Sequence, residues 1–131
     1  DGIIKNIPNK ITKLAYTETS LKLNPKGSVC IAMYGATIGK LGILDFPATT
    51  NQACCVCSDF KGIGNLYLFY YLKQHKNIFI QQGFGGAQSN ISKEKIISTL
   101  LPLPPLGEQK RIVSKIEELF EALDHIQSNL V

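Results

Sequence analysis

Residues 35–40 come closer to a phosphate-binding loop than any other part of this sequence, because two glycines precede Lys40. A P-loop needs four residues between its glycines and a Ser or Thr after its Lys, which cradle phosphates and hold Mg²⁺. Here three residues separate Gly35 from Gly39, and Leu41 follows the lysine. We therefore expect a hairpin turn whose glycines adopt unusual backbone angles, and no nucleotide hydrolysis.

Four cysteines are candidate metal ligands or disulfide partners, namely Cys30, Cys54, Cys55 and Cys57. The three that are close together lack a second pair at the spacing of a zinc site, and no histidine is near them. Thiols without a secretion signal are typical of a reducing cytoplasm, which is the expected location. We expect these side chains to be buried as small hydrophobic residues, without a metal.

Catalytic groups do not assemble into a recognisable motif. His75 stands among lysines of an expected helix, His125 flanks an apolar helix stripe, and we expect both rings to be solvated. The carboxylates are scattered, so no nucleophile, base and orienting group can be assigned. We expect a non-catalytic chain that needs no cofactor.

Polar and basic side chains suited to DNA contacts gather in three linkers and at the 35–40 turn. Asn and Gln amides can hydrogen-bond adenine, and Lys can bind phosphates or guanine. Loops are polar in any globular protein, so composition alone leaves an ordinary surface as the alternative. The candidate DNA-binding residues are Lys10, Thr12, Lys13, Lys40, Thr50, Asn51, Gln52, Gln88, Ser89 and Asn90.

The charge of the chain is divided unevenly along its 131 residues. Residues 1–100 carry eleven lysines against five acidic residues, a net charge of +6, whereas residues 101–131 carry three basic and five acidic residues, a net charge of −2. A basic body suits a polyanion, and an acidic tail suits another task. No apolar run is long enough to span a membrane.

Strands and helices must position these side chains. Short apolar runs bounded by turn residues predict strands at 28–34, 41–45 and 53–58, with a shorter one at 11–15. Helical spacing predicts one helix from Asn65, as its N-cap, to about residue 83, and a short helix at 93–97 capped by Ser92. One domain of α+β class follows, with a small mixed sheet.

The strongest periodic signal lies beyond the prolines at 102–105. Apolar residues recur at steps of four and three, which is a heptad seam. A helix over 106–131 is roughly 39 Å long at 1.5 Å per residue, which is about the span of a small domain. We expect a coiled-coil helix, and the alternative is a terminal helix folded onto its own domain. The expected interface residues are Ile112, Ile116, Leu119, Leu123, Ile126 and Leu130.

Five segments together resemble the specificity subunit of type I restriction-modification systems. In chain order they read PKGSV at 25–29, GATIGK at 35–40, TNQA at 50–53, GAQSNIS at 86–92 and LPPLGEQKRIV at 103–113. The resemblance runs from about Ile11 to the C-terminus. Ser89 replaces the proline that is common after Gln in this motif.

The resemblance implies a target-recognition domain at 1–105, without its N-terminal part, and a conserved spacer and dimerisation helix at 106–131. Such a domain reads one half of a bipartite site in double-stranded DNA. The helix packs antiparallel against that of a second specificity repeat or of a homodimer partner, and docks methyltransferase subunits. Methyl transfer and DNA cleavage belong to the methyltransferase and restriction subunits, so the specificity chain itself is expected to be non-catalytic and without a cofactor.

Two alternatives remain beside this hypothesis. The chain could be the specificity region of a fused methyltransferase-endonuclease, which catalytic motifs upstream of Asp1 would reveal. It could also be a coiled-coil assembly module with an incidental basic body that binds no DNA.

Overall fold

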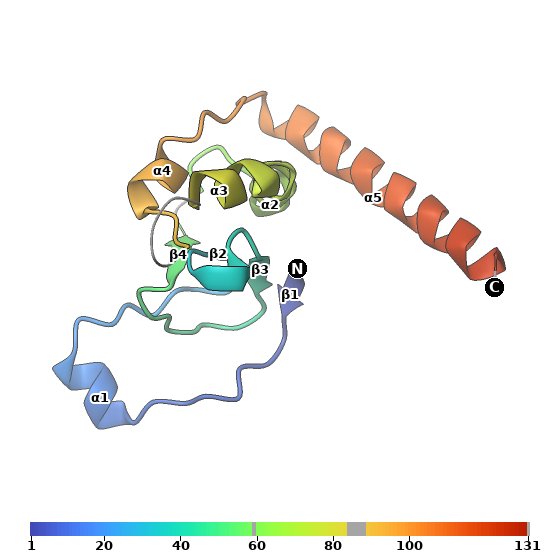
Figure 1. Ribbon diagram of the computed structural model, residues 1–131. Coiled ribbons are helices and arrows are strands. Elements are labelled where there is room, and N and C mark those ends of the chain that lie inside the picture. The colour runs from blue at the N-terminus through green and yellow to red at the C-terminus, as the bar shows by residue number, and fades with distance from the viewer. Residues whose placement is uncertain (59, 84–88, 131) are drawn as a thin grey trace.

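The computed structural model describes residues 1–58, 60–83 and 89–130 (Figure 1). Its elements follow in the order β1 (Gly2–Ile4), α1 (Lys13–Glu18), β2 (Val29–Ala32), the 3-10 turn η1 (Gly35–Thr37), β3 (Leu41–Leu44), β4 (Cys54–Cys57), α2 (Asn65–Gln74), α3 (Lys76–Gly83), α4 (Lys93–Ile97) and α5 (Leu106–Asn129). The expected α+β class with a long final helix is confirmed.

The strands form one mixed sheet in the order β1-β3-β2-β4. β2 pairs antiparallel with β3, as the expected hairpin at 35–40 requires, and antiparallel with β4 on its other side, whereas β1 pairs parallel with β3. Between β2 and β3 the chain turns at Gly35 and Gly39, whose φ angles of +60° and +76° are favoured by glycine. The hairpin interpretation of residues 35–40 is thus confirmed.

Three expectations about secondary structure are wrong. Residues 11–15 form no strand, because the Thr12 hydroxyl accepts a hydrogen bond from the Ala15 N–H at 3.1 Å and caps helix α1. The expected single helix at 65–83 is two helices that meet at His75. Asn65 is also the first residue of α2 rather than its N-cap, because the extended backbone of the N-cap is at Gly64; the Asn65 amide instead donates to the Gly27 carbonyl at 3.2 Å.

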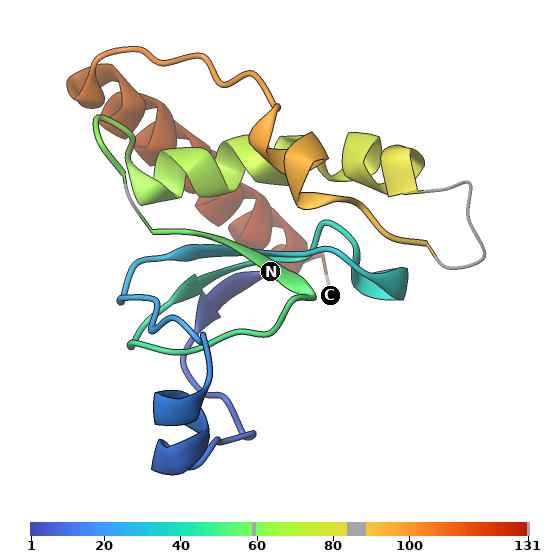
Figure 2. The same cartoon turned by 90° about the vertical axis from the view of Figure 1, so that its left-hand side faces the viewer.

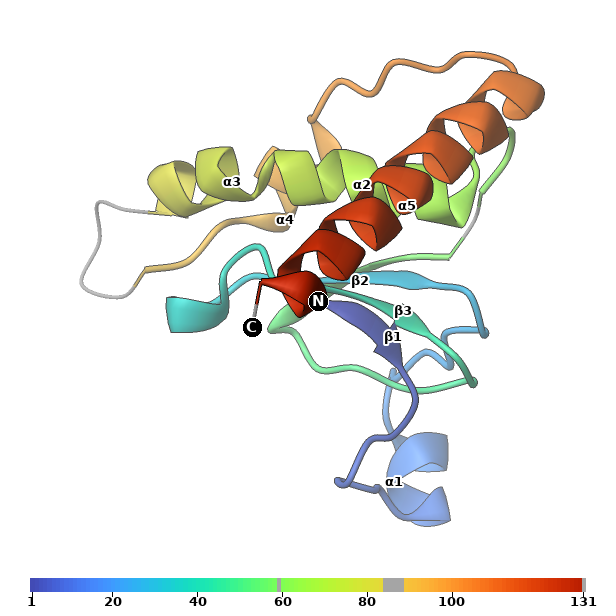
Figure 3. The same cartoon turned by 90° about the vertical axis from the view of Figure 1, so that its right-hand side faces the viewer.

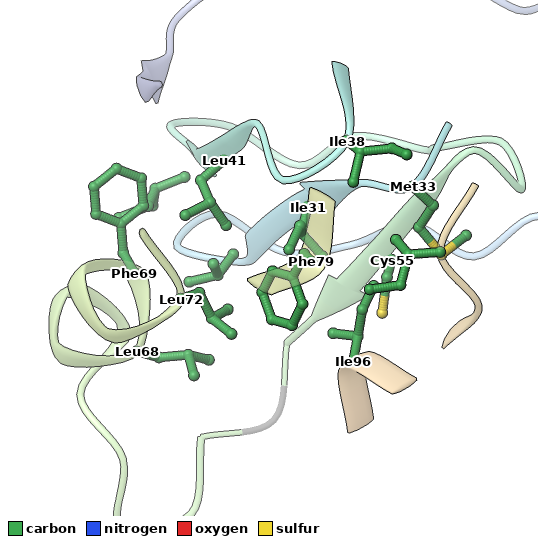
Figure 4. Close-up of a cluster of buried hydrophobic side chains, with 13 residues drawn as sticks. Ile31, Met33, Ile38, Leu41, Cys55, Leu68, Phe69, Leu72, Phe79 and Ile96 are labelled. Atoms are coloured by element: carbon green, nitrogen blue, oxygen red, sulfur yellow. The ribbon is translucent and has the colours of Figure 1, made fainter. Parts of the chain in front are cut away.

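Helices α2, α3 and α4 cover one face of the sheet (Figure 2). The main core between them buries Phe79, Ile31 and Leu72 among other apolar side chains (Figure 4). A smaller cluster around Cys30 and Leu44 lies on the opposite face. Burying these side chains is the main source of stability of the domain.

The cysteines divide between the two faces of the sheet. Cys55 is buried in the main core and Cys30 in the smaller cluster, as expected for small hydrophobic residues, while Cys54 and Cys57 are half-buried. A hydrogen bond between the Cys30 and Cys54 thiols raises the pKa of Cys30 and lowers that of Cys54. Burial raises the pKa of the Cys55 thiol.

The buried Cys55 thiol predicts a loss of stability in alkali. The unfolded chain ionises this thiol near its ordinary pKa of 9.0, whereas the folded chain does so only at higher pH. The contribution of the protonated Cys55 thiol to the free energy of unfolding is therefore full below about pH 9, and it is lost as the pH rises towards the pKa of the thiol in the folded chain. Urea titrations from about pH 8 to about pH 10 should show a shallower loss of unfolding free energy for Cys55→Val than for the wild type. Equal slopes in the two proteins would contradict this assignment.

Helix α5 leaves the body after packing across α2 (Figure 3). Its N-terminal half contributes buried side chains, whereas residues 117–130 are exposed. None of the helices within residues 1–58, 60–83 and 89–130 combines the length and the apolar character that crossing a bilayer requires.

Candidate nucleic-acid interface

A long N-terminal arm, residues 5–23, carries the first group of candidate residues. Helix α1 stands away from the sheet at the far end of this arm (Figure 1). The arm and the loop at 46–49 line a groove of about 540 Å³, here called the arm groove. Lys10, Thr12 and Lys13 lie on its arm side, together with the exposed ring of Tyr16, and Thr49 lies on its loop side. The fold thus brings the first candidate group next to the central linker.

The central candidate group lines a second groove of about 340 Å³, here called the lysine groove. Thr50, Asn51 and Gln52 lie there beside Lys22 from the arm and Lys93 from the start of α4. Sequence reasoning missed both lysines, because they are far apart in the chain and carry no local motif. Only the folding of the arm against the linker brings them together.

The arm and lysine grooves share a border. Asn24 and Ala48 exchange backbone hydrogen bonds of 2.8 and 3.0 Å, and the Asn24 amide donates to the Ala48 carbonyl at 3.2 Å. Leu23 and Thr49 line the arm groove, whereas Asn24 and Thr50 line the lysine groove. The two grooves therefore lie on either side of one fixed pairing between arm and linker.

The last candidate group lies at the β2–β3 hairpin. Ser89 and Asn90 line a groove of about 810 Å³, together with Tyr34 and Gly35, and the Gly35 N–H donates to the Ser89 carbonyl at 2.8 Å. Gln88 lies outside the described residues. Lys40 is exposed but lines none of the grooves described above, so the fold does not bring it together with the other candidates.

The groove lysines are available to an anion. Within the described residues, no ion pair engages Lys10, Lys13, Lys22 or Lys93. Lys26, by contrast, pairs with Asp45 at 2.7 Å, and this contact lowers the pKa of that carboxyl group. Unpaired lysines beside amide side chains suit a ligand that presents phosphates and hydrogen-bonding edges together.

The two histidines lie in different environments. His75 is half-buried, which differs from the expected solvated ring, because it ends α2 and its Nδ1 lies 3.0 Å from the Tyr71 carbonyl. His125 is exposed near the end of α5, as expected. In the part of the chain that the structure describes, no three His, Cys, Asp or Glu side chains come together as metal ligands do.

The heptad seam of α5 is divided between two environments. Ile112 and Ile116 are half-buried and Val113 is buried, so the first half of the helix packs on its own domain. The remaining seam residues are exposed by 54 to 81%, namely Leu119, Leu123, Ile126 and Leu130. The alternative of a helix folded onto its own domain thus describes the first half of α5. Coiled-coil pairing of the exposed second half stays a prediction.

A protein family and several curated proteins match most of this chain. The family described as "Type I restriction modification DNA specificity domain" matches residues 2–130. The EcoR124I/EcoR124II specificity subunit of Escherichia coli is 23% identical over 98% of this chain and 33% of that subunit. The putative MjaX specificity subunit of Methanocaldococcus jannaschii is 27% identical over 83% of this chain and 26% of that subunit. This chain therefore spans about a third or less of these relatives.

Solved structures agree in fold. The HsdS subunit from Thermoanaerobacter tengcongensis superposes with a TM-score of 0.71 at 20% identity, covering 84% of this chain and 26% of that subunit. A chain from a study of complex assembly and conformational transition of the type I R-M system gives 0.65 at 23% identity, covering 82% of this chain and 27% of its own length.

Proposed function

This chain belongs to the family of type I restriction-modification DNA specificity domains, and from that premise we propose that it reads one half of a bipartite DNA site. The specificity subunit family is non-catalytic. In this proposal the chain selects the site, and partner methyltransferase and restriction subunits perform the chemistry. The chain acts in the cytoplasm.

The arm groove and the lysine groove are the observation that supports this proposal most directly. Lys10, Lys13 and Lys22 come from the arm and Lys93 comes from the start of α4, and together they line two grooves with a common border. Lysines would hold the phosphates and set the register, while Asn51 and Gln52 would contact base edges. The remaining proposed contacts are Thr12, Lys40, Thr50, Gln88, Ser89 and Asn90.

The division of labour within the chain follows the same proposal. In this proposal, residues 1–105 serve as the recognition domain, and the segment 106–131, which contains α5, serves as the spacer. The exposed distal seam supports pairing of α5 with a second copy or with a second specificity repeat, because several apolar side chains on one helix face remain uncovered. Methyltransferase subunits would dock on the paired helices, and the restriction subunit would join the complex that they form.

Replacing Lys13 by alanine tests the phosphate role. A duplex is first selected by the wild-type chain from a random pool, and its affinity is then measured by fluorescence anisotropy over a range of salt concentrations. Loss of one phosphate contact is expected to weaken binding several-fold to every duplex, and to lower the slope of log K against log salt by about 0.9.

The matched control is Lys61→Ala, because Lys61 is exposed and lines none of the grooves described above. This control should bind as the wild type does. A Lys13→Ala protein that loses affinity for one sequence only, and whose affinity keeps the wild-type dependence on salt, would contradict the phosphate role. A wild-type chain that selects no sequence at all would instead favour the assembly module.

A further inference from the structure

Gln109 is the one buried polar side chain of α5 within the described residues, and it is only 1% exposed. Its Oε1 accepts a hydrogen bond from the Gly64 N–H at 2.8 Å. Its Nε2 donates to the Gly62 carbonyl at 2.9 Å and to the Pro104 carbonyl at 2.8 Å. Both amide donors and an acceptor are therefore used, and all three partners are backbone groups outside the helix.

These three bonds join separate parts of the molecule. Gly64 is the N-cap of α2, Gly62 lies in the loop before it, and Pro104 belongs to the linker that leads into α5. Gly62 has a φ of +76°, a conformation that favours glycine, so the position of its carbonyl depends on that residue type. Gln109 thus connects the long helix to the body at the point where the helix begins.

A second contact holds α5 further along. The Phe120 ring stacks on Tyr70 of α2 with centroids 6.2 Å apart, and Lys73 Nζ lies 5.5 Å from the Phe120 centroid. Eleven residues separate Gln109 from Phe120, which is about 16 Å along the helix. Apolar contacts tolerate sliding because they are non-directional, whereas three hydrogen bonds require one geometry. The Gln109 hydrogen bonds are therefore the directional contacts that restrict the rotation and axial position of α5.

Because α5 is long, a small change in its direction at Gln109 displaces its far end by a large distance. From Gln109 to Asn129 the helix extends about 30 Å, and residues 121–129 are exposed. A tilt of about 10° would move the far end by roughly 5 Å, which exceeds the 3.4 Å rise of one base pair. A small change of helix direction at Gln109 would thus displace the end of α5 by more than the rise of one base pair.

We propose that Gln109 is a positioning residue that fixes the direction of α5 relative to the recognition domain, and with it the spacing of the two DNA half-sites. This proposal rests on the proposed function, because it assumes that α5 pairs with a counterpart which carries the second recognition domain. Gln109 touches no DNA in this role; it acts through the helix.

The test compares Gln109→Met, which keeps the length of the side chain and removes all three hydrogen bonds, with Gln127→Met at an exposed site on the same helix. Spin labels are introduced through an unnatural amino acid at Lys61 and Ser128 of the full chain. The labelled chain is diluted into an excess of unlabelled chain, so that pairing through α5 adds no distance between labels of two chains. Electron–electron dipolar spectroscopy should then give one narrow distance for the wild type and for Gln127→Met. It should give a broadened or shifted distribution for Gln109→Met.

A second readout uses the duplex selected by the wild-type chain, with its spacer lengthened or shortened one base pair at a time. The wild type should prefer one spacer, and Gln109→Met should accept neighbouring spacers with less than about a threefold difference in affinity while still binding each half-site. General destabilisation would lower binding to all spacers equally. Gln109→Glu, which keeps the acceptor for Gly64 and loses both donors, is the second variant and should also broaden both readouts.

Wild-type label distances and an unchanged spacer preference in a folded Gln109 variant would overturn the proposal. If the wild type selects no duplex, the proposed function fails, and the label distances still decide whether Gln109 fixes the helix. The two failures are therefore distinguishable.

Discussion

Leu119→Asp is expected to halve the mass of the particle in solution while the body of the chain stays folded. Leu119 is the first seam residue of α5 that the chain's own domain leaves exposed, at 54%. In an antiparallel pair of helices the substitution would place a carboxylate in the apolar seam once from each chain. We expect a cost of at least about 3 kcal/mol, which raises the dissociation constant of the pair more than a hundredfold.

Size-exclusion chromatography with light scattering measures this mass directly. Glu121→Gln is the matched control, because residue 121 lies about 200° around the helix from Leu119 and so faces away from the seam. This control should keep the wild-type mass. An unchanged mass for Leu119→Asp, or a wild-type chain that is already monomeric, would remove homodimer pairing from the proposed function.

Phe79→Ala is expected to have the largest effect on stability. The Phe79 ring is 1% exposed and lies at the centre of the main core, between the sheet and helices α2 and α4 (Figure 4). Removing a buried ring leaves a cavity that the neighbours fill only partly, and such changes cost about 3–5 kcal/mol. Domains of this size are stable by only about 5–15 kcal/mol, so a large fraction of the stability would be lost.

Urea unfolding followed by circular dichroism gives this free energy. The neighbouring Ile78 is 46% exposed, so Ile78→Ala on the same helix controls for the change to alanine. Ile78→Ala should lower the free energy of unfolding much less than Phe79→Ala does. Equal costs for the two variants would show that the Phe79 ring is not an essential part of the core.

Patterns that are local in sequence predicted the larger elements well. The strands around Val29, Ile43 and Cys55 are apolar runs between turn residues, and α5 has a clear helical period after a run of prolines. Strand β1 was missed because it has three residues and pairs with a strand some forty positions away. The break at His75 was missed because neither Gly nor Pro marks it.

The candidate interface was predictable in its residue types but not in its assembly. Asn51 and Gln52 stand in a polar linker that a reader of the sequence can select. Their neighbours Lys22 and Lys93 come from opposite ends of the domain, and only the tertiary fold brings them to one groove. The heptad pattern likewise predicted an apolar face on α5, but the pattern is the same where the helix meets its own domain and where it does not.

The arm is tied to the sheet at both ends. Before it, β1 pairs with β3; after it, Asn24 pairs with Ala48 and the Gly27 N–H donates to the Leu44 carbonyl at 2.7 Å. Helix α1, at its far end, contributes no buried residue. The entropy of closing a loop rises only slowly with its length. Changes in the length or sequence of the arm are therefore expected to cost the sheet little stability, while they alter the surface chemistry that the arm presents.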